Sequence, residues 1–290
     1  MTPRTNRWVL GARPRTLPAA VAPVAVGTAV GASEGPLRAW RALAALVVAL
    51  ALQVGVNYAN DYQDGTRGAD RDRVGPTRLV ASGLAAPAQV RAAAVLSFAL
   101  AAAAGLVLAI VVSPWLILVG TASIAAAWAY TGGPRPYGYD GFGEVFVFVF
   151  FGVVATTGSA FVQHGRLSGL ALVCSVPVGL LAAALLAVNN LRDRPRDAVA
   201  SKRTLAVRLG DRAARRFYAL LVVIALACPL VIALARTRAL IALVAVPLAV
   251  SPMRRVLSGA EGRALVTALG ETARVQLVFA GALALGVWPR

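Results

Sequence analysis

Nine long apolar segments recur along the chain and are separated by short polar connections. A membrane-spanning helix needs about 20 mostly apolar residues. The segments that approach this length cover residues 17–33, 40–59, 89–111, 114–131, 144–162, 168–190, 214–235, 239–256 and 264–288. Hydrophobic residues make up 59% of the chain and charged residues only 14%. These features predict an all-α, polytopic membrane protein with nine transmembrane helices.

The basic residues follow a membrane topology and do not form a surface for nucleic acid. The formal net charge is +17. If the N-terminus is cytoplasmic, alternate loops place 23 Lys and Arg residues inside and 6 outside. Positive charge concentrates in cytoplasmic loops, so we expect a bacterial plasma-membrane protein with its N-terminus inside and its C-terminus outside. This pattern accounts for the charge without a nucleic-acid partner. The sequence carries no recognisable signal for an oligomeric state.

Two polar clusters end the second and sixth apolar segments, both on the predicted cytoplasmic side. Residues four apart share a helix face, so each cluster is predicted to aim a row of oxygen atoms in one direction. Their spacing suggests pseudo-symmetric halves, roughly 1–131 and 144–256, with a last helix at 264–288. We expect one integral-membrane domain over 1–290 with a central cavity. The clusters contain Asn57, Asn60, Asp61 and Asp64, then Asn189, Asp193 and Asp197.

Clustered carboxylates repel one another and are costly at a membrane interface unless a cation neutralises them. Magnesium prefers oxygen ligands and is usually held by one or two carboxylates and substrate phosphates. The two rows therefore suit a magnesium-bound diphosphate, and the absence of Cys/His clusters argues against zinc. Alternatively, the acids solvate helix ends and pair with neighbouring arginines such as Arg67, Arg71, Arg192 and Arg194. Two such clusters on one membrane face favour a function.

Three other segments carry candidate site residues. Lys202 is the only lysine, and with Arg203 it could bind a phosphate or simply contribute to the positive-inside loop. The loop from Tyr130 to Glu144 is rich in glycine and proline. Its tyrosines, with Asp140 and Glu144, could bind and deprotonate a phenolic acceptor, or they could anchor the membrane interface. Arg13, before the first span, could contact an anionic substrate or serve as an anchor.

These residues resemble motifs of the UbiA superfamily of intramembrane aromatic prenyltransferases, most closely its 1,4-dihydroxy-2-naphthoate polyprenyltransferase branch, the MenA family. Asn60-Asp61-x-x-Asp64 resembles the first Asp-rich motif, and Asp193-x-x-x-Asp197 resembles the second. Many superfamily members have an acid where this chain has Gly68. Here the acid is Asp70, a spacing similar to that of the naphthoate branch. Ser201 departs from the glycine expected before Lys-Arg-Thr.

The resemblance implies a UbiA-like bundle that transfers a polyprenyl group from polyprenyl diphosphate to 1,4-dihydroxy-2-naphthoate. Carbon dioxide and diphosphate would be lost and demethylmenaquinone formed, as in menaquinone synthesis. The implied Mg²⁺ ligands are Asn60, Asp64, Asp193 and Asp197. The implied catalytic residues are Asp61, Lys202, Arg203 and Tyr139. The implied substrate-binding residues are Asn57, Asn60, Asp70, Asn189, Arg192, Tyr130, Tyr137 and Arg13.

Three other functions are compatible with parts of this pattern. A related enzyme could use 4-hydroxybenzoate or homogentisate as the aromatic acceptor. A cation- or proton-coupled transporter could use membrane-embedded Asp residues, but transporter sites lie near the bilayer midplane and these acids end helices. A membrane CDP-alcohol phosphotransferase also uses clustered Asp and magnesium, but with a single long signature and not two separated motifs.

Overall fold

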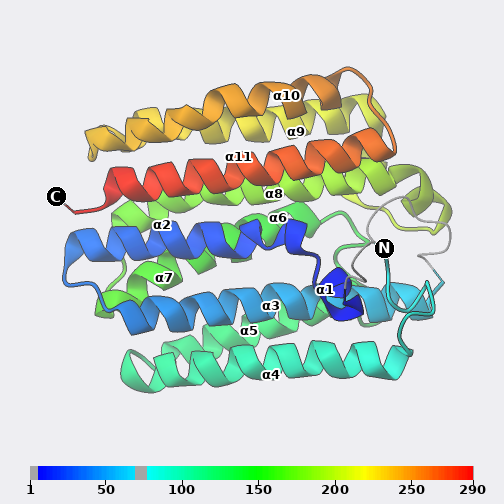
Figure 1. Cartoon of the computed structure of the whole chain (residues 1–290), viewed down its shortest axis with the longest axis horizontal. Coiled ribbons are helices and arrows are strands. Elements are labelled where there is room, and N and C mark those ends of the chain that lie inside the picture. The colour runs from blue at the N-terminus through cyan, green and yellow to red at the C-terminus, as the bar shows by residue number, and fades with distance from the viewer. Residues whose placement is uncertain (1–5, 69–76, 290) are drawn as a thin grey trace.

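The computed structural model describes residues 6–68 and 77–289, and within them the chain folds into helices without any strand. The long helices lie side by side along one axis (Figure 1). Asp70, predicted to bind substrate, lies outside the described residues. The first half contains α1 (Arg7–Ala12), η1 (Pro14–Thr16), α2 (Pro18–Glu34), α3 (Ala39–Thr66), α4 (Pro87–Val111) and α5 (Trp115–Ala129).

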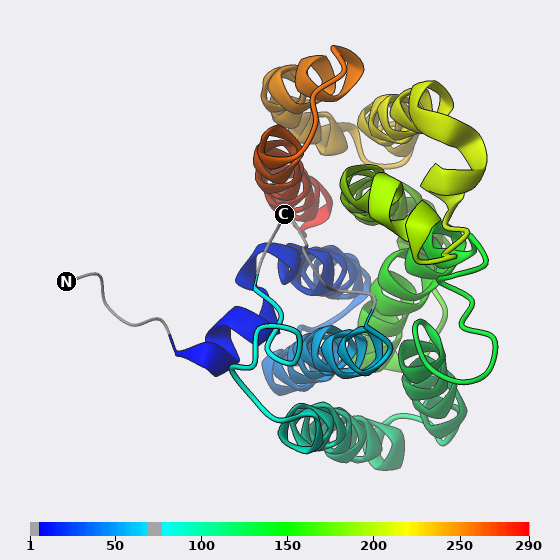
Figure 2. The same cartoon turned by 90° about the vertical axis from the view of Figure 1, so that its right-hand side faces the viewer.

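The second half begins with a span built from three consecutive segments, of which the middle one, η2, is π-helical. Viewed along the helices, α2, α3, α5, α7 and α8 surround a common centre, while α9 and α10 lie at the periphery (Figure 2). The elements are α6 (Gly143–Val147), η2 (Phe148–Val154), α7 (Ala155–His164), α8 (Gly169–Val199), α9 (Leu205–Ile232), η3 (Thr237–Ala245), α10 (Val246–Leu257) and α11 (Arg263–Val287).

Each of the nine predicted spans overlaps one of these helical segments. Among the described residues, seven segments are long and apolar enough to cross a membrane. An eighth span is obtained if α1–η1 and α2 are joined across a 53° bend, at which Pro18 starts the new helix. The one remaining predicted span, 114–131, corresponds to α5, which is apolar but has only 15 residues. The protein is therefore a polytopic helical membrane protein, and the count of nine stays a prediction.

Helices α3 and α8 both extend beyond their predicted apolar spans. Their 28 and 31 residues correspond to lengths of about 42 and 46 Å at 1.5 Å per residue, whereas the hydrocarbon core of a bilayer is about 30 Å thick. The apolar pattern ends near residues 59 and 190, but the helical hydrogen bonds continue to Thr66 and Val199. Both helices therefore carry the polar clusters at and beyond the ends of their apolar segments on rigid helical backbone.

Small residues allow the helices around the centre to approach closely. A Cβ added to Gly152 of η2 would lie 2.4 Å from the Cα atom of Gly179 of α8, and one added to Gly27 of α2 would lie 2.2 Å from the carbonyl oxygen of Thr156 of α7. In lipid, helices associate through such close packing because no hydrophobic force drives them together. These contacts fix α2, α7 and α8 around the central space.

Candidate active site

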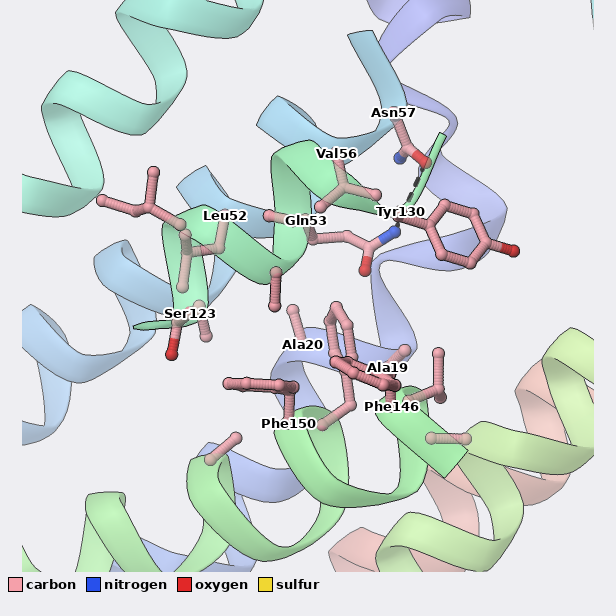
Figure 3. A pocket seen from close by; sticks show the side chains of 18 of the residues that line it. Ala19, Ala20, Leu52, Gln53, Val56, Asn57, Ser123, Tyr130, Phe146 and Phe150 are labelled. Carbon is pink, nitrogen blue, oxygen red and sulfur yellow. Dashed lines mark hydrogen bonds between the residues drawn. The ribbon is translucent and has the colours of Figure 1, made fainter. Parts of the chain in front are cut away.

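A cavity of about 520 Å³ lies among α2, α3, α4, α5, α7 and α8. Its walls are mainly apolar and aromatic, and side chains such as Leu52, Phe146 and Phe150 point into it (Figure 3). Its polar lining gathers where α3 and α8 end, at the level of Asp64 and Asp193. The cavity thus combines a charged inner end with a long apolar interior.

The α3 row faces the cavity as predicted, except for Asp61. Asn57, Asn60 and Asp64 line the cavity. Asp61 is 0% exposed and is not part of the wall. Its Oδ2 accepts a hydrogen bond from the backbone N–H of Leu79 (2.8 Å), and its Oδ1 accepts one from that of Val80 (3.1 Å).

The expectation of a catalytic Asp61 is therefore not met by the geometry. Next to Asn60 in the helix, Asp61 points about 100° away from it, because an α-helix has 3.6 residues per turn. The carboxylate anchors the segment that follows α3 and does not face the substrate space.

The α8 row also faces the cavity. Asn189, Asp193 and Asp197 line it, as predicted, on one helix face. Arg192 is buried but is not part of the cavity wall, which differs from its predicted contact with substrate. Its guanidinium donates to both carboxylate oxygens of Asp193 (2.8 and 2.7 Å) and to Oδ1 of Asn189 (2.9 Å). Arg192 therefore positions the row from behind.

Asp64 is the point at which distant parts of the chain meet. The Lys202 Nζ atom donates to Oδ1 of Asp64 at 2.9 Å, and the Tyr139 hydroxyl donates to the same oxygen at 2.6 Å. Arg78 Nη2 lies 3.7 Å from Oδ2 of Asp64. All four side chains line the cavity. The ends of α3 and α8 are thereby joined through the loop that contains Lys202.

The backbone of this loop holds Lys202 in place. Lys202 N–H donates to the Asp197 carbonyl (2.8 Å), and Arg203 N–H donates to the Tyr139 carbonyl (2.7 Å). Ser201 has φ 58°, in the left-handed region that glycine adopts more readily. The Arg203 side chain is exposed and does not line the cavity. The predicted role of Arg203 in diphosphate binding is therefore not supported, and its backbone supplies the ordered contact.

Tyr139 is suited to donate a proton in a hydrogen bond and not to act as a base. Burial, and then the neighbouring Asp64 carboxylate, raise the pKa of Tyr139 above its ordinary value. The phenol consequently stays neutral and donates to Asp64. Asp140 is exposed, and Glu144 accepts from Nδ2 of Asn190 at 2.9 Å. Neither acid lines the cavity, so the predicted deprotonation by this loop is not supported.

Aromatic rings form one wall beside the polar end. Tyr137 stacks on Phe146 with ring centroids 3.9 Å apart, and it meets Tyr130 edge to face at 5.5 Å. Phe150 continues the series, 6.0 Å from Phe146. The Tyr137 hydroxyl donates to the Ala126 carbonyl (2.9 Å), so the polar atom of this side chain is already engaged. Tyr130 and Tyr137 thus line the cavity as part of an aromatic wall, and their contact with substrate stays a prediction.

The N-terminal segment covers the cavity from the side of α2. Nδ2 of Asn57 donates to the Ala12 carbonyl (2.9 Å) and to the Thr16 hydroxyl (3.1 Å). Arg13 lines the cavity, as a substrate-binding residue must, and its φ of 53° turns the chain there. Asn57 therefore positions this segment as well as contributing to the wall.

The side chains at the polar end fit magnesium. All candidate ligands are amide or carboxylate oxygens, and they come from two helices. In the described part of the chain, no three His, Cys, Asp or Glu residues are close enough together to hold a metal alone. This arrangement suits an ion that is bound by one or two carboxylates and completes its shell with phosphate oxygens.

Several polar residues of the cavity were missed by the sequence reasoning. Asn190 and Arg196 lie three residues before and three residues after Asp193 in α8, so both were within reach of a helical-face argument. Arg78 and Thr131 carry no motif. Thr131 donates to Oδ1 of Asn60 (2.8 Å), a contact across 71 residues that only the folded structure reveals.

The fold and site define an intramembrane enzyme of the prenyltransferase class, with two acid-bearing helix ends facing one apolar cavity. Residues 20–286 match the UbiA prenyltransferase family, and the chain therefore belongs to this family.

Two curated relatives cover nearly the whole chain. The 1,4-dihydroxy-2-naphthoate octaprenyltransferase of Mycobacterium tuberculosis is 52% identical over 97% of both chains. The enzyme of the same name from Mycobacterium leprae is 50% identical over 96% of this chain and 95% of its own. Among solved structures, a UbiA homologue from Archaeoglobus fulgidus bound to GPP and Mg²⁺ superposes with a TM-score of 0.67. It is 16% identical over 97% of this chain and 100% of its own, a similarity that shows the shared fold.

Proposed function

We propose that the protein transfers a polyprenyl group from polyprenyl diphosphate to 1,4-dihydroxy-2-naphthoate, as expected for an enzyme of menaquinone synthesis. The observation that carries this proposal is the convergence of the α3 and α8 rows on the polar end of one apolar cavity. The Mycobacterium tuberculosis relative, 52% identical, bears the name of a 1,4-dihydroxy-2-naphthoate octaprenyltransferase, which supports this choice of acceptor.

In this proposal Asn60, Asp64, Asp193 and Asp197 hold Mg²⁺. When bound, the ion neutralises diphosphate charge and so favours its departure from the allylic carbon. The Archaeoglobus homologue was solved with Mg²⁺ and GPP, which agrees with a site for a metal and a diphosphate in this fold.

The cations around Asp64 are placed to receive the leaving diphosphate. Lys202 Nζ and Arg78 Nη2 both lie at the polar end of the cavity, at 2.9 and 3.7 Å from the Asp64 oxygens. Preorganised positive groups stabilise charge that develops on a leaving group. Tyr139 retains its proton and holds the shared carboxylate oxygen in position.

The two substrates would use different walls of the cavity. The aromatic wall of Tyr130, Tyr137 and Phe146 would lie against the planar acceptor, beside the polar end. The apolar interior would hold the prenyl tail and exclude water from the allylic cation. A bond then forms between C1 of the prenyl group and the ring carbon that bears the carboxylate, as the C–O bond to diphosphate breaks. That carbon then loses its carboxylate as CO₂, and the electrons of the broken C–C bond restore the aromatic ring.

We also propose that the active site faces the cytoplasm of a bacterial cell, with the N-terminus inside and the C-terminus outside. The excess of basic residues on the side where α3 and α8 end supports this orientation. Accessibility of single introduced cysteines to an impermeant thiol reagent in whole cells would test it. Labelling next to Asp64 from outside would reverse the proposed orientation.

The decisive experiment is a prenyl-transfer assay with the purified protein in lipid, with and without a chelator. We expect transfer to the naphthoate that requires Mg²⁺ and is lost in Asp64→Ala but retained in Glu261→Ala, a change of an exposed acid outside the cavity. Product with 4-hydroxybenzoate or homogentisate, and none with the naphthoate, would replace the proposed acceptor. Magnesium-independent cation flux that survives Asp193→Asn would indicate a transporter instead.

A further inference from the structure

The start of the loop between α5 and α6 is packed against the α3 row. Thr131 is 5% exposed, and its Oγ1 atom lies within hydrogen-bonding distance of Oδ1 of Asn60 (2.8 Å) and of Oε1 of Gln63 (2.5 Å). Asn60 and Gln63 are three residues apart and therefore share a face of α3. Asn60 and Thr131 line the cavity, whereas Gln63 does not. The Thr131 hydroxyl thus joins a cavity-lining amide to a second amide behind it.

The backbone of this loop is held at the same place by other contacts. Arg67, at the end of α3, donates from Nη1 to the Thr131 carbonyl and from Nη2 to the Gly133 carbonyl (2.8 Å). A Cβ added to Gly132 would lie 2.3 Å from Nε2 of Gln63, so the close approach of the loop to α3 requires glycine there. The position of the Thr131 backbone therefore does not depend on its hydroxyl.

One proton serves both amides. A hydroxyl group has a single proton to donate, and Thr131 faces the oxygens of both Asn60 and Gln63. The Gln63 amide is fixed at its other end, where Nε2 donates to the Trp128 carbonyl (3.4 Å). In the described part of the chain, Thr131 is the one residue hydrogen-bonded to the Asn60 side chain. Loss of the hydroxyl would therefore leave the Asn60 amide free to rotate.

We propose that Thr131, supported by Gln63, is a positioning residue that holds the Asn60 amide oxygen in place for Mg²⁺. The proposal rests on the proposed function, because it takes Asn60 as a ligand of that ion. Hydrogen bonds from outside the ligand set orient metal ligands and raise metal affinity. When Oδ1 of Asn60 gives its electrons to the ion, the Thr131 proton can turn to Gln63 without loss of a hydrogen bond. Gln63 is thus the spare acceptor that lets Thr131 stay in place.

The test separates the hydroxyl from the rest of the Thr131 side chain. Thr131→Val replaces the hydroxyl by a methyl group, and Thr131→Ser keeps the hydroxyl. Gln63→Met leaves Thr131 intact but removes the acceptor behind it. Thr267→Val is the matched control, because Thr267 is exposed on α11 outside the cavity. Thermal unfolding in detergent shows whether each variant is folded.

The measurement is binding and not turnover. Isothermal titration calorimetry follows the binding of a thio analogue of geranyl diphosphate, which resists cleavage, to the purified protein at a series of Mg²⁺ concentrations. We expect the Mg²⁺ concentration for half-maximal binding to rise about tenfold in Thr131→Val, the lower end of the range typical for loss of a partner of a metal ligand. Gln63→Met should raise it about threefold to tenfold. Thr131→Ser and Thr267→Val should stay within about twofold of the wild type.

At saturating Mg²⁺, all of these proteins should bind the analogue with the affinity of the wild type, because Thr131 acts through the metal ligand. A folded Thr131→Val or Gln63→Met protein with the wild-type Mg²⁺ dependence would overturn the proposal. A loss of affinity in Thr131→Val that persists at saturating Mg²⁺ would also overturn it, because it would indicate direct contact with the donor. A wild-type protein that does not bind the analogue at any Mg²⁺ concentration would instead refute the proposed function itself.

Discussion

Asp64 at the end of α3 and Asp193 at the end of α8 line the same cavity, yet their neighbours come from different distances along the chain. Asp64 is contacted by Lys202, 138 residues away, and by Tyr139, 75 residues away. Asp193 is bonded by Arg192, the adjacent residue. The Arg192–Asp193 pair thus forms within one helix, whereas the contacts of Asp64 with Lys202 and Tyr139 depend on the assembled tertiary structure. Changes on the α3 side should therefore affect more of the site.

The largest difference is expected between the two carboxylates. Asp64→Asn should lower kcat/KM about 10³-fold, and Asp193→Asn about 10²-fold. These values are the upper and lower ends of the range of about 10²- to 10³-fold that is typical for loss of one preorganised group. Asp64 should cost more because its loss also releases Lys202 and Tyr139. Initial rates over a range of Mg²⁺ concentrations measure both effects. An Asp193→Asn enzyme that is as impaired as Asp64→Asn would contradict the comparison.

The cations that serve the two acids should differ in the same direction. Lys202→Met should lower kcat/KM about 10²-fold, because it removes a charge that faces the cavity. Arg192→Met should cost only about tenfold, mainly as a higher requirement for Mg²⁺, because Arg192 acts through Asp193 and Asn189. Steady-state kinetics at several metal concentrations separates the two. A larger effect of Arg192→Met would indicate direct contact with substrate.

Tyr139→Phe should have a smaller effect, about tenfold on kcat/KM, through loss of one hydrogen bond to a carboxylate. Burial and Asp64 raise the pKa of Tyr139 above its ordinary value of about 10, so the phenol stays protonated at every pH below that value. Wild type and Tyr139→Phe should therefore show pH–rate profiles of the same shape between about pH 6 and 9. A basic limb that disappears in Tyr139→Phe would show that this phenol ionises during turnover.

The smallest effect on chemistry is expected at Asp61, despite its place beside Asn60. Asp61→Asn should lower the free energy of unfolding by about 1–3 kcal/mol, because an amide cannot accept both backbone N–H groups and leaves one unsatisfied. The kcat of the folded fraction should change by at most about threefold. Thermal unfolding in detergent and active-site titration distinguish these quantities. A large loss of kcat without loss of stability would restore Asp61 as a catalytic residue.

Much of the bundle follows from local pattern, because an apolar segment in lipid must satisfy its backbone hydrogen bonds as a helix. The helical segments were therefore predictable, as was the alignment of Asp193 and Asp197 on one face of α8. The ends of α3 and α8 were not, since the helices continue after the apolar pattern stops. Hydropathy reports the membrane boundary, whereas capping and tertiary contacts decide where a helix ends.

The site was predictable where a motif lies on one helix and unpredictable where the loops meet it. Lys202 was recognised because it is the only lysine, but its contact with Asp64 depends on the path of the loop after α8. Arg203 and Asp61 were predicted to be catalytic because they adjoin motif residues, but neither lines the cavity. Adjacency in the sequence does not determine the direction of a side chain. Arg78 belongs to no motif, and only folding brings it near Asp64.

The buried apolar cluster of Val24, Ala45, Leu108 and Val162, which lines one part of the cavity, also bears on the electrical potential across the membrane. The cavity brings carboxylates and basic groups deep into a protein that spans the bilayer, and a continuous polar path would conduct ions. Moving one elementary charge across 100 mV releases about 2.3 kcal/mol, so even a narrow leak would dissipate stored energy. This cluster interposes an uncharged, apolar layer where an ion would lose its hydration at high cost. The protein can thus contain a polar active-site cavity in a membrane that carries an electrical potential without letting ions leak through it.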